Sequence, residues 1–476
     1  MKKKYYITTT LPYVNADPHI GFALEIVQAD VLARWQRNKG AEVFFNTGTD
    51  EHGQKIYKRA KKVGLEPKKY VDGLVKQFQL LKEKLNLSYN SFVRTTDKQH
   101  KRAAQELWKL CKTNGFIEKG VYEVKYCVGC EMEKTDSELE NGRCPLHPNE
   151  EIEIRKEENY FFKFSKLEED LKKFYQKNPD FVRPKNRQRE IENFVSSGLK
   201  DFSISRLKRK MPWGIPVPGD EEQVMYVWFD ALTNYISALG WPNSGWKEFW
   251  GNTKERKVIQ LAGKDNLRQQ AAIWQAMLMA AGLPPSKQIM IHGFITANGQ
   301  KMSKSLGNVI NPNKYVDQYG TDAVRYFLLA KIHPFEDSDF TKAKFEAAYN
   351  DDLANGLGNL VARIESMAAK EKFKVELEIE SATVNHEIDE ALENYRFDRA
   401  LEIVWQKIRQ ANTFINERRV WQLSKEEKKE ALNHLIKEIR EIGKMLEIFL
   451  PGTGREIEAR FKGKIRRNKA LFPRLN

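Results

Sequence analysis

The chain has 476 residues, which is too long for a single hydrophobic core, so two to four domains are expected. Hydrophobic residues make up 41% of it, but no apolar run approaches the ~20 residues of a membrane span. A membrane protein is therefore excluded, and a cytoplasmic one is expected. Lysine and arginine number 80 against 65 acidic residues, a net charge of +15. This excess suits a nucleic-acid partner, although solvated lysine-rich helices would give the same charge.

The first 115 residues alternate in the way of a parallel α/β sheet. Residues 5–10 form a β-rich run, residues 19–38 have the apolar spacing of a helix, and residues 42–46 form a second β-rich run. Strand, helix and strand open a parallel sheet, whose ligands bind beyond the carboxyl ends of the strands. We therefore predict that residues 1–115 are the first half of a nucleotide-binding catalytic domain.

The alternation is interrupted and then resumes. Residues 116–224 are charged and irregular and contain a cysteine cluster and several proline-rich stretches. Residues 225–310 resume the α/β pattern, with strands expected at 258–262 and 289–292 and a helix at 267–281. The predicted sheet is thus discontinuous in sequence, and residues 116–224 are predicted to be an inserted connective domain.

Long amphipathic helices replace the strand signals near the end of the chain. Residues 346–476 are predicted to form a helix bundle, in which Ser424 and Glu427 are spaced to form a capping box. The bundle's apolar residues at helical spacing are Phe397, Leu401, Val404, Ile408, Ala411 and Ile415, then Leu432, Leu435, Ile439, Ile442 and Leu446. The expected fold class is α/β, with a Rossmann-like parallel sheet split by an insertion and followed by an all-α bundle.

Three of the 4 cysteines lie close to a histidine in the predicted insertion. Cys127-x-x-Cys130 is followed after thirteen residues by Cys144-x-x-His147, the spacing of a tetrahedral zinc knuckle. Three unrelated core cysteines are the alternative. Because the protein would supply all four ligands, no position is left for a catalytic water, so we predict one structural Zn²⁺ per chain. The remaining Cys111 is expected in the core.

Two short motifs indicate phosphate chemistry. His19-x-Gly21 opens the first predicted helix, where free backbone N–H groups and the helix dipole favour a phosphate. The sequence KMSKS at residues 301–305 follows the last predicted strand, and its lysines and hydroxyls can close over a triphosphate. Each motif alone also fits ordinary turn chemistry or a solvated basic loop. Together, on one discontinuous sheet, they resemble the signature of class I aminoacyl-tRNA synthetases.

Within that class the whole chain resembles the methionyl-tRNA synthetase family. The matching segments, in the family's order, are TLPY at 10–13, TGTDEHGQK at 47–55, VWFDA at 227–231, GKD at 263–265 and IHGF at 291–294. The resemblance implies a ligase that activates L-methionine with ATP and Mg²⁺ and transfers it to the 3′ end of tRNA(Met). It also implies a zinc knuckle in the insertion and, at residues 311–345, a linker that contacts the tRNA stem. A monomer is expected.

The resemblance also implies which residues form each site. The catalytic residues would be His19, Gly21, Lys301 and Lys304. Those at ATP would be His19, Gly21, Phe22, Gly263, Lys264, Asp265, Lys301, Ser303 and Lys304. Those at methionine would be Leu11, Tyr13, Asp50, Trp228, Ala231, Tyr235, Gln270 and Trp274. Those that read the anticodon would be Asn359, Arg363 and Trp421. The aromatic residues among them would also be typical of a core.

The chain departs from the family's usual pattern in two places. Phe22 stands where a second histidine is usual and cannot donate to a phosphate, so Lys301 and Lys304 are expected to carry more of the phosphate charge. Gln269 and Gln270 stand where the family tends to have an aromatic residue and a histidine. The wall of the amino-acid pocket is therefore expected to be more polar than usual.

Two alternative functions stay open at the level of sequence. One is a class I synthetase for leucine, isoleucine, valine or cysteine, although residues 116–224 are few for a hydrolytic editing domain. The other is a tRNA-binding synthetase paralogue that has lost activation, which only Phe22 and Gln270 favour. Exchange of pyrophosphate into ATP, measured with each amino acid in turn, separates these two alternatives from the methionine enzyme.

Overall fold

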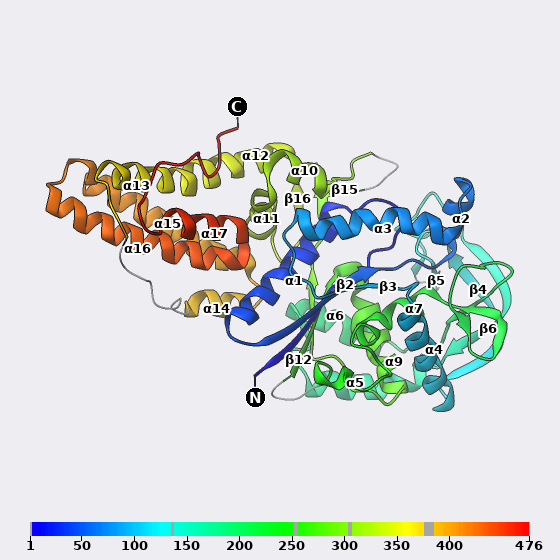
Figure 1. Ribbon diagram of the computed structural model, residues 1–476. Helices are drawn as coiled ribbons and strands as arrows, with labels where there is room; N and C mark the ends of the chain where they lie inside the picture. The colour runs from blue at the N-terminus through cyan, green and yellow to red at the C-terminus, as the bar shows by residue number, and fades with distance from the viewer. Residues whose placement is uncertain (1, 135–137, 252–255, 303–306, 376–384, 476) are drawn as a thin grey trace. The chain divides into compact units, whose positions relative to one another are not determined.

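The computed structural model describes residues 2–134, 138–251, 256–302, 307–375 and 385–475. The chain divides into two compact units (Figure 1). The first consists of Met1–Pro18, Gln36–Leu80 and Tyr89–His292, and the second of His19–Trp35, Leu81–Ser88 and Gly293–Asn476. Among the described residues, no helix combines the length and apolarity that crossing a membrane requires.

A six-stranded parallel sheet forms the centre of the first unit. Its order is β3-β2-β1-β12-β13-β7, so strands far apart in the sequence are neighbours, with Tyr6 opposite Val258. The strands are β1 Lys4–Thr8, β2 Glu42–Thr49, β3 Ser91–Arg94, β7 Val182–Arg183, β12 Arg256–Gly263 and β13 Gln288–His292. β1 and β12 are buried along almost their whole length, as in a parallel sheet covered on both faces. The predicted discontinuous parallel sheet is confirmed.

The edge strand β7 comes from the region predicted to be an insertion. Val182 pairs with Ile289 of β13. The helices on either side of β7, α5 (Glu168–Lys177) and α6 (Lys185–Ser196), bury Tyr175 and Ile191 in the same hydrophobic core as the sheet. Residues 116–224 are thus partly continuous with the catalytic core, and the predicted domain boundaries stay a prediction.

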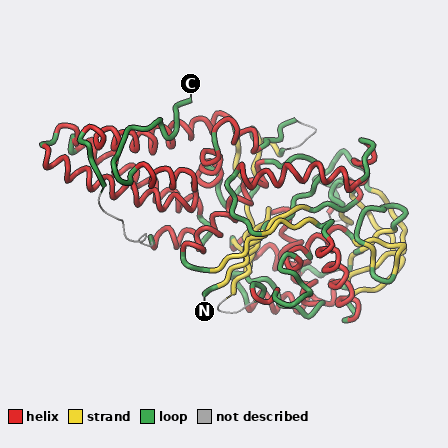
Figure 2. The backbone as a smooth tube through the Cα atoms, in the orientation of Figure 1, coloured by secondary structure: helices red, strands yellow, loops and turns green. Residues whose placement is uncertain are grey.

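The rest of residues 116–224 is mostly antiparallel. A four-stranded sheet has the order β5-β4-β6-β8, and a three-stranded sheet the order β10-β11-β9. The strands are β4 Ile117–Cys127, β5 Met132–Lys134, β6 Glu153–Phe162, β8 Phe202–Ser203, β9 Ser205–Leu207, β10 Pro216–Val217 and β11 Asp220–Met225. Figure 2 shows the long antiparallel strands β4 and β6 in yellow. Cys127 is the last residue of β4, and Cys130, Cys144 and His147 lie between these two strands in the chain.

The first unit contains further helices besides α5 and α6, although α3 ends in the second unit. They are α2 Gln54–Lys62, α3 Pro67–Lys84, α4 Lys98–Thr113, α7 Val227–Leu232, α8 Asn234–Ser237 and α9 Trp274–Ala280. The helix predicted at 267–281 is less regular than expected, because a π-helical turn at Gln269–Ile273 precedes α9. Such turns concentrate at functional sites. Cys111 of α4 is fully buried in the core, as predicted.

The second unit is mainly helical. Its helices are α1 Ile20–Asn38, α10 Pro312–Tyr319, α11 Thr321–Ala330, α12 Lys342–Ala348, α13 Asn359–Lys370, α14 His386–Glu393, α15 Phe397–Glu417, α16 Lys425–Phe449 and α17 Pro451–Arg460. A small sheet has the order β15-β14-β16, with β14 Ile295–Ala297, β15 Gln300–Lys301 and β16 Ser338–Phe340. The apolar residues predicted to face the bundle core in α15 and α16 are buried. The capping box of Ser424 and Glu427 is present.

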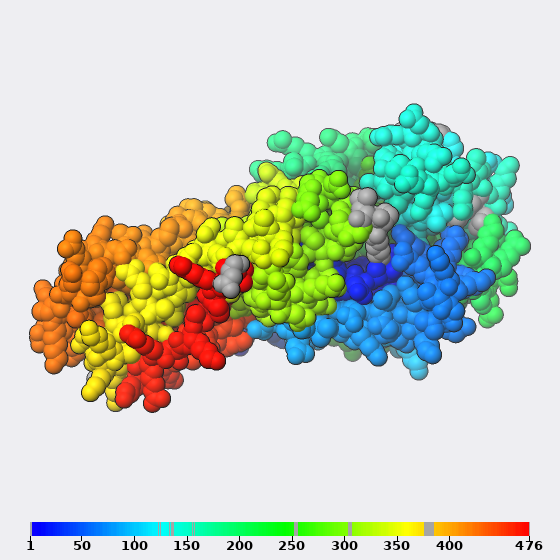
Figure 3. All heavy atoms as spheres, turned by 90° about the horizontal axis from the view of Figure 1, so that it is seen from above, coloured from blue at the N-terminus to red at the C-terminus, as the bar shows by residue number. Residues whose placement is uncertain are grey.

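The C-terminal segment is packed against α13. Figure 3 shows this segment in red beside the yellow helix. Asn468 donates to the Glu365 carboxylate at 2.9 Å, and Arg467 donates to Ser366 Oγ at 2.6 Å. Basic residues after α17 are therefore held on the surface of the bundle.

A buried ion pair stabilises α1 in the second unit. The sequence predicts one apolar face for this helix, yet the carboxylate of Asp30 is fully buried as well. Arg325 of α11 lies 2.8 Å from it and also donates to the carbonyl of Phe449 at 2.6 Å. Arg34 pairs with the same carboxylate at 2.7 Å. Because the two arginines neutralise its charge, the Asp30 carboxylate can be buried in the interior.

Candidate active site and metal site

Asp50 directly follows β2, at the edge of the sheet where ligands of parallel α/β proteins bind. It forms a parallel bridge with Tyr13, and its N–H donates to the carbonyl of Pro12 at 3.0 Å. The side chain is buried, and its Oδ1 has no hydrogen-bond partner in the described part of the chain. Burial, followed by the nearby charges of Asp230 and Glu131, raises the pKa of Asp50 well above its ordinary value. A bound ammonium group would neutralise the negative charge of the Asp50 carboxylate and donate the hydrogen bond that Oδ1 lacks.

Aromatic side chains predicted to bind methionine occur on α7, α8 and α9. Trp228 of α7 is half-buried, and its buried Nε1 has no acceptor among the described residues. Tyr235 of α8 and Trp274 of α9 are buried, with ring centroids 5.6 Å apart. Ala231 lies one helical turn after Val227 and is buried, while Leu11 is half-buried. The structure therefore brings Tyr235 and Trp274 into contact, as it does Tyr13 and Asp50.

Gln270 is held in a buried network of amides. Its Nε2 donates to Tyr235 Oη at 2.6 Å, and its Oε1 accepts from Gln260 Nε2 at 3.4 Å. Ser286 Oγ donates to Gln260, and Gln275 Nε2 donates to Ser286 Oγ at 3.3 Å. Both ends of the Gln270 amide are thus occupied, which fixes its orientation. Sequence reasoning identified Gln270 but missed Gln260, Gln275 and Ser286, which no local motif marks.

A second buried hydrogen-bond network connects α7 with the segment that follows β2. Asp230 accepts from His52 Nδ1 at 2.6 Å and from His100 Nε2 at 2.7 Å. His100 Nδ1 also contacts Ser237 Oγ at 2.9 Å. Burial by itself would raise the pKa of Asp230, but the two histidines lower it overall. His52 and Asp230 lie inside the segments that resemble the family, whereas His100 has no signal in the sequence.

The phosphate motifs lie in the second unit. The N–H of Gly21 donates to His19 Nδ1 at 3.1 Å, which leaves the proton of a neutral imidazole on Nε2. His19 is exposed at the start of α1. Phe22 is 6% exposed and packs in the interior. Lys301 on β15 is exposed, with Nζ 5.6 Å from the Phe294 ring centroid.

The other residues predicted to bind ATP belong to the first unit or lie outside the described residues. Gly263 ends β12, and Lys264 and Asp265 begin the turn that follows. A Cβ on Gly263 would lie 2.8 Å from Asp265 Oδ1, so a side chain at this position would displace the Asp265 carboxylate. Ser303 and Lys304 lie outside the residues that the structure describes.

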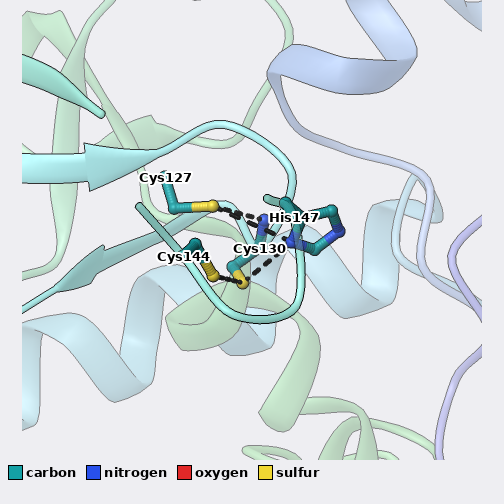
Figure 4. Close-up of side chains that lie close together, drawn as sticks. All are labelled: Cys127, Cys130, Cys144 and His147. Carbon is teal, nitrogen blue, oxygen red and sulfur yellow. Dashed lines mark hydrogen bonds between the residues drawn. The ribbon is translucent and has the colours of Figure 1, made fainter. Parts of the chain in front are cut away.

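The predicted metal ligands converge on one point (Figure 4). The ligand atoms of Cys127, Cys130, Cys144 and His147 all lie within 4.8 Å of one another. Cys130 Sγ is 3.2 Å from His147 Nδ1 and 3.4 Å from Cys144 Sγ. The N–H of Cys130 donates to Cys127 Sγ at 3.4 Å, and a Cβ on Gly129 would overlap the His147 ring. Three thiols and one imidazole in this arrangement are compatible with a tetrahedral metal ion.

The residues predicted to read an anticodon lie at one end of the helix bundle. Asn359 and Arg363 are one turn apart on α13, and Asn359 is exposed. The Arg363 guanidinium donates to Asn416 Oδ1 at 2.6 Å and lies 6.0 Å from the Trp421 ring centroid. Trp421 is 49% exposed. An exposed aromatic ring with an arginine over it suits stacking on an unpaired base.

Comparison with known families agrees with this arrangement. The sequence profile of the family described as tRNA synthetases class I (M) matches residues 5–153 and 134–365. The fold and these motifs define the chain as a class I aminoacyl-tRNA synthetase, an ATP-dependent ligase.

Relatives and solved structures narrow the class to one family. The chain is 39% identical to the methionine–tRNA ligase of Caldanaerobacter subterraneus over 96% of its own length and 74% of that protein. It is 46% identical to the one of Thermosynechococcus vestitus over 78% of its own length and 70% of the relative. Mycobacterium tuberculosis methionyl-tRNA synthetase in complex with methionyl-adenylate superimposes with a TM-score of 0.91, at 31% identity over 100% of both chains. The chain belongs to the methionyl-tRNA synthetase family.

Proposed function

We propose that the chain activates methionine with ATP to methionyl-adenylate and transfers the methionyl group to the 3′ end of tRNA(Met). The observation that carries the proposal is the buried Oδ1 of Asp50, which lacks a partner among the described residues at the ligand-binding edge of the sheet. The names of the relatives support it, because they are methionine–tRNA ligases.

Methionine would be held at its two ends by different chemistry. Asp50 would bind the ammonium group, whose positive charge compensates the burial that raises the pKa of this carboxyl. Polarizable aromatic rings suit the thioether of the side chain. The residues proposed for this pocket are Leu11, Tyr13, Asp50, Trp228, Ala231, Tyr235, Gln270 and Trp274.

In the first step the methionine carboxylate would attack the α-phosphorus of ATP, and pyrophosphate would leave. The carboxylate is ionised at neutral pH, so no general base is needed, and catalysis reduces to positioning and charge stabilisation. We assign that stabilisation to His19 Nε2, the Gly21 backbone, Lys301 and Lys304, with Phe22, Gly263, Lys264, Asp265 and Ser303 also at the nucleotide. Mg²⁺ bound with ATP would supply further positive charge at the phosphates.

The cluster of Cys127, Cys130, Cys144 and His147 would hold one Zn²⁺. Zinc is favoured because thiolate and imidazole ligands in a tetrahedral, fully protein-ligated site are typical of its structural centres. Such a site stabilises the fold and takes no part in the reaction.

tRNA(Met) would contact the helix bundle through Asn359, Arg363 and Trp421. The net charge of +15 favours association with a polyanion. Trp421 would stack on an anticodon base, while Asn359 and Arg363 offer hydrogen bonds to base edges. The predicted monomeric state stays a prediction, which analytical ultracentrifugation can test.

The test of the proposal is exchange of pyrophosphate into ATP with single amino acids. Methionine should support exchange, whereas leucine, isoleucine, valine and cysteine should not. Exchange with one of those four instead would indicate another class I specificity. No exchange with any amino acid would indicate a tRNA-binding paralogue that has lost activation.

A further inference from the structure

A buried glutamate, Glu131, lies in the loop next to the Cys/His cluster. It has no role in the reaction proposed above. Glu131 directly follows the proposed ligand Cys130, and its side chain is only 7% exposed. Its backbone has a φ of 51°, in the left-handed region that side chains other than glycine rarely adopt. Contacts with the surrounding structure, rather than local preference, must hold it there. We call residues 130–132 the knuckle loop.

The Glu131 carboxylate joins Tyr13 to the start of α2. Its Oε1 accepts a hydrogen bond from Tyr13 Oη at 3.0 Å and another from the N–H of Lys55 at 2.8 Å. A Cβ on Gly53 would lie 2.6 Å from Tyr13 Oη and 2.8 Å from Glu131 Oε2, so there is no spare room between them. The first turn of a helix also favours an anion. One carboxylate oxygen therefore fixes the phenol of Tyr13.

Two further contacts link the knuckle loop to the walls of the proposed amino-acid pocket. Tyr226 Oη donates to the backbone carbonyl of Glu131, and Tyr226 is the N-cap residue of α7, which carries Trp228. Gln269 in the π-helical turn donates to Met132 Sδ at 3.4 Å. The loop thus contacts three separate elements that contribute to the pocket.

We propose that Glu131 is a positioning residue for methionine, acting through Tyr13. This inference rests on the proposed function. Without the carboxylate, the Tyr13 hydroxyl and the Lys55 N–H both lose their acceptor. The phenol then keeps its contact with the backbone of Ile56 but is less firmly fixed. Methionine binding should weaken, whereas ATP binding should not change.

Three variants separate positioning from general damage. Glu131→Ala removes the acceptor, and Glu131→Gln keeps a carbonyl oxygen that can accept both bonds. Glu150→Ala changes an exposed glutamate in the same region and serves as the matched control. The readouts are the Kd of methionine by calorimetry, the KM values for methionine and ATP in pyrophosphate exchange, and bound metal per chain.

Glu131→Ala should raise the Kd and KM of methionine about tenfold, the loss expected for one hydrogen bond to a charged group. Its KM for ATP should change less than about twofold, and Glu131→Gln and Glu150→Ala should stay close to the wild type in both. Tyr13→Phe removes the hydroxyl group that donates to Glu131, and so abolishes the same hydrogen bond. In that background Glu131→Ala should add little, because neighbouring changes that act through one contact are not additive.

The inference is wrong if Glu131→Ala retains its metal and binds methionine as tightly as the wild type. It is also wrong if the KM values for methionine and ATP rise together, or if the full effect persists in the Tyr13→Phe background. Should Glu131→Ala fail to fold, unchanged methionine binding in Tyr13→Phe alone would overturn it. A wild-type protein without methionine-dependent exchange refutes the proposed function instead.

Discussion

Replacing Asp50 with asparagine should impair methionine binding and stabilise the protein at the same time. The pKa of Asp50 is raised mainly by burial of its carboxyl group. The negative charges of Asp230 and Glu131 nearby raise it further. A raised pKa in the folded state means that ionisation of Asp50 costs stability. This cost is fully present above the raised pKa, declines as pH falls below it, and is gone below the ordinary pKa that the carboxyl has in the unfolded chain. Asparagine has the same shape and no charge, so it removes the cost.

The expected magnitudes follow from the same geometry. Losing the charge that pairs with a buried ammonium should cost about 3 kcal/mol, which is more than a hundredfold in the KM of methionine. Without ligand, Asp50→Asn should raise the free energy of unfolding by about 1 kcal/mol, since residues kept for function are commonly destabilising by about this amount. Methionine should stabilise the wild type and leave Asp50→Asn unchanged.

The assay combines urea unfolding at several pH values with methionine titrations. For the wild type without ligand, stability relative to Asp50→Asn should fall as pH rises, and methionine should bind more tightly as Asp50 ionises. Leu11→Ile is a suitable control, because it alters the proposed pocket without changing its charge. An Asp50→Asn variant that is less stable than the wild type at every pH, or that binds methionine normally, would refute the reasoning.

Three further changes test other parts of the structure. Cys144→Ser should lower bound zinc from one ion per chain to near zero, whereas Cys111→Ser should retain it; undiminished zinc in Cys144→Ser would contradict the ligand set. Arg325→Met leaves the Asp30 charge buried without this partner and should lower the free energy of unfolding by about 3–5 kcal/mol; a urea midpoint equal to that of the wild type would argue against the ion pair. Trp421→Ala should raise the KM for tRNA about tenfold, through lost stacking, without changing methionine-dependent exchange; Trp421→Phe should retain most of the affinity, and equal losses in both variants would exclude stacking.

Four strands of the central sheet, β1, β2, β12 and β13, could be predicted because they are apolar and lie beside recognisable motifs, whereas the short strand β3 was not predicted. The runs at 42–46 and 258–262 read as buried strands, and β2 and β12 occupy them. The edge strand β7 could not be found in this way, because Val182 and Arg183 alone carry no periodicity. Its place in the sheet depends on pairing with β13, a contact between residues far apart in the sequence.

The candidate site was only partly predictable for a similar reason. Asp50 and Gln270 lie in recognisable segments, and the Cys/His spacing pointed to a cluster that the structure confirms. The partners that orient these residues lie elsewhere in the chain. His100 and Ser286, for example, reach their networks from a helix and a loop with no motif of their own. Sequence spacing reports local geometry, whereas a buried network is assembled by the tertiary fold.

The central claim is tested most directly by charging of tRNA(Met) with radiolabelled methionine by the purified protein in the presence of ATP and Mg²⁺. We predict that methionine becomes attached to the 3′ end of this tRNA, and that a tRNA with a different anticodon is charged poorly. The account would be contradicted if no methionyl-tRNA formed while another amino acid was transferred, or if no amino acid was transferred at all.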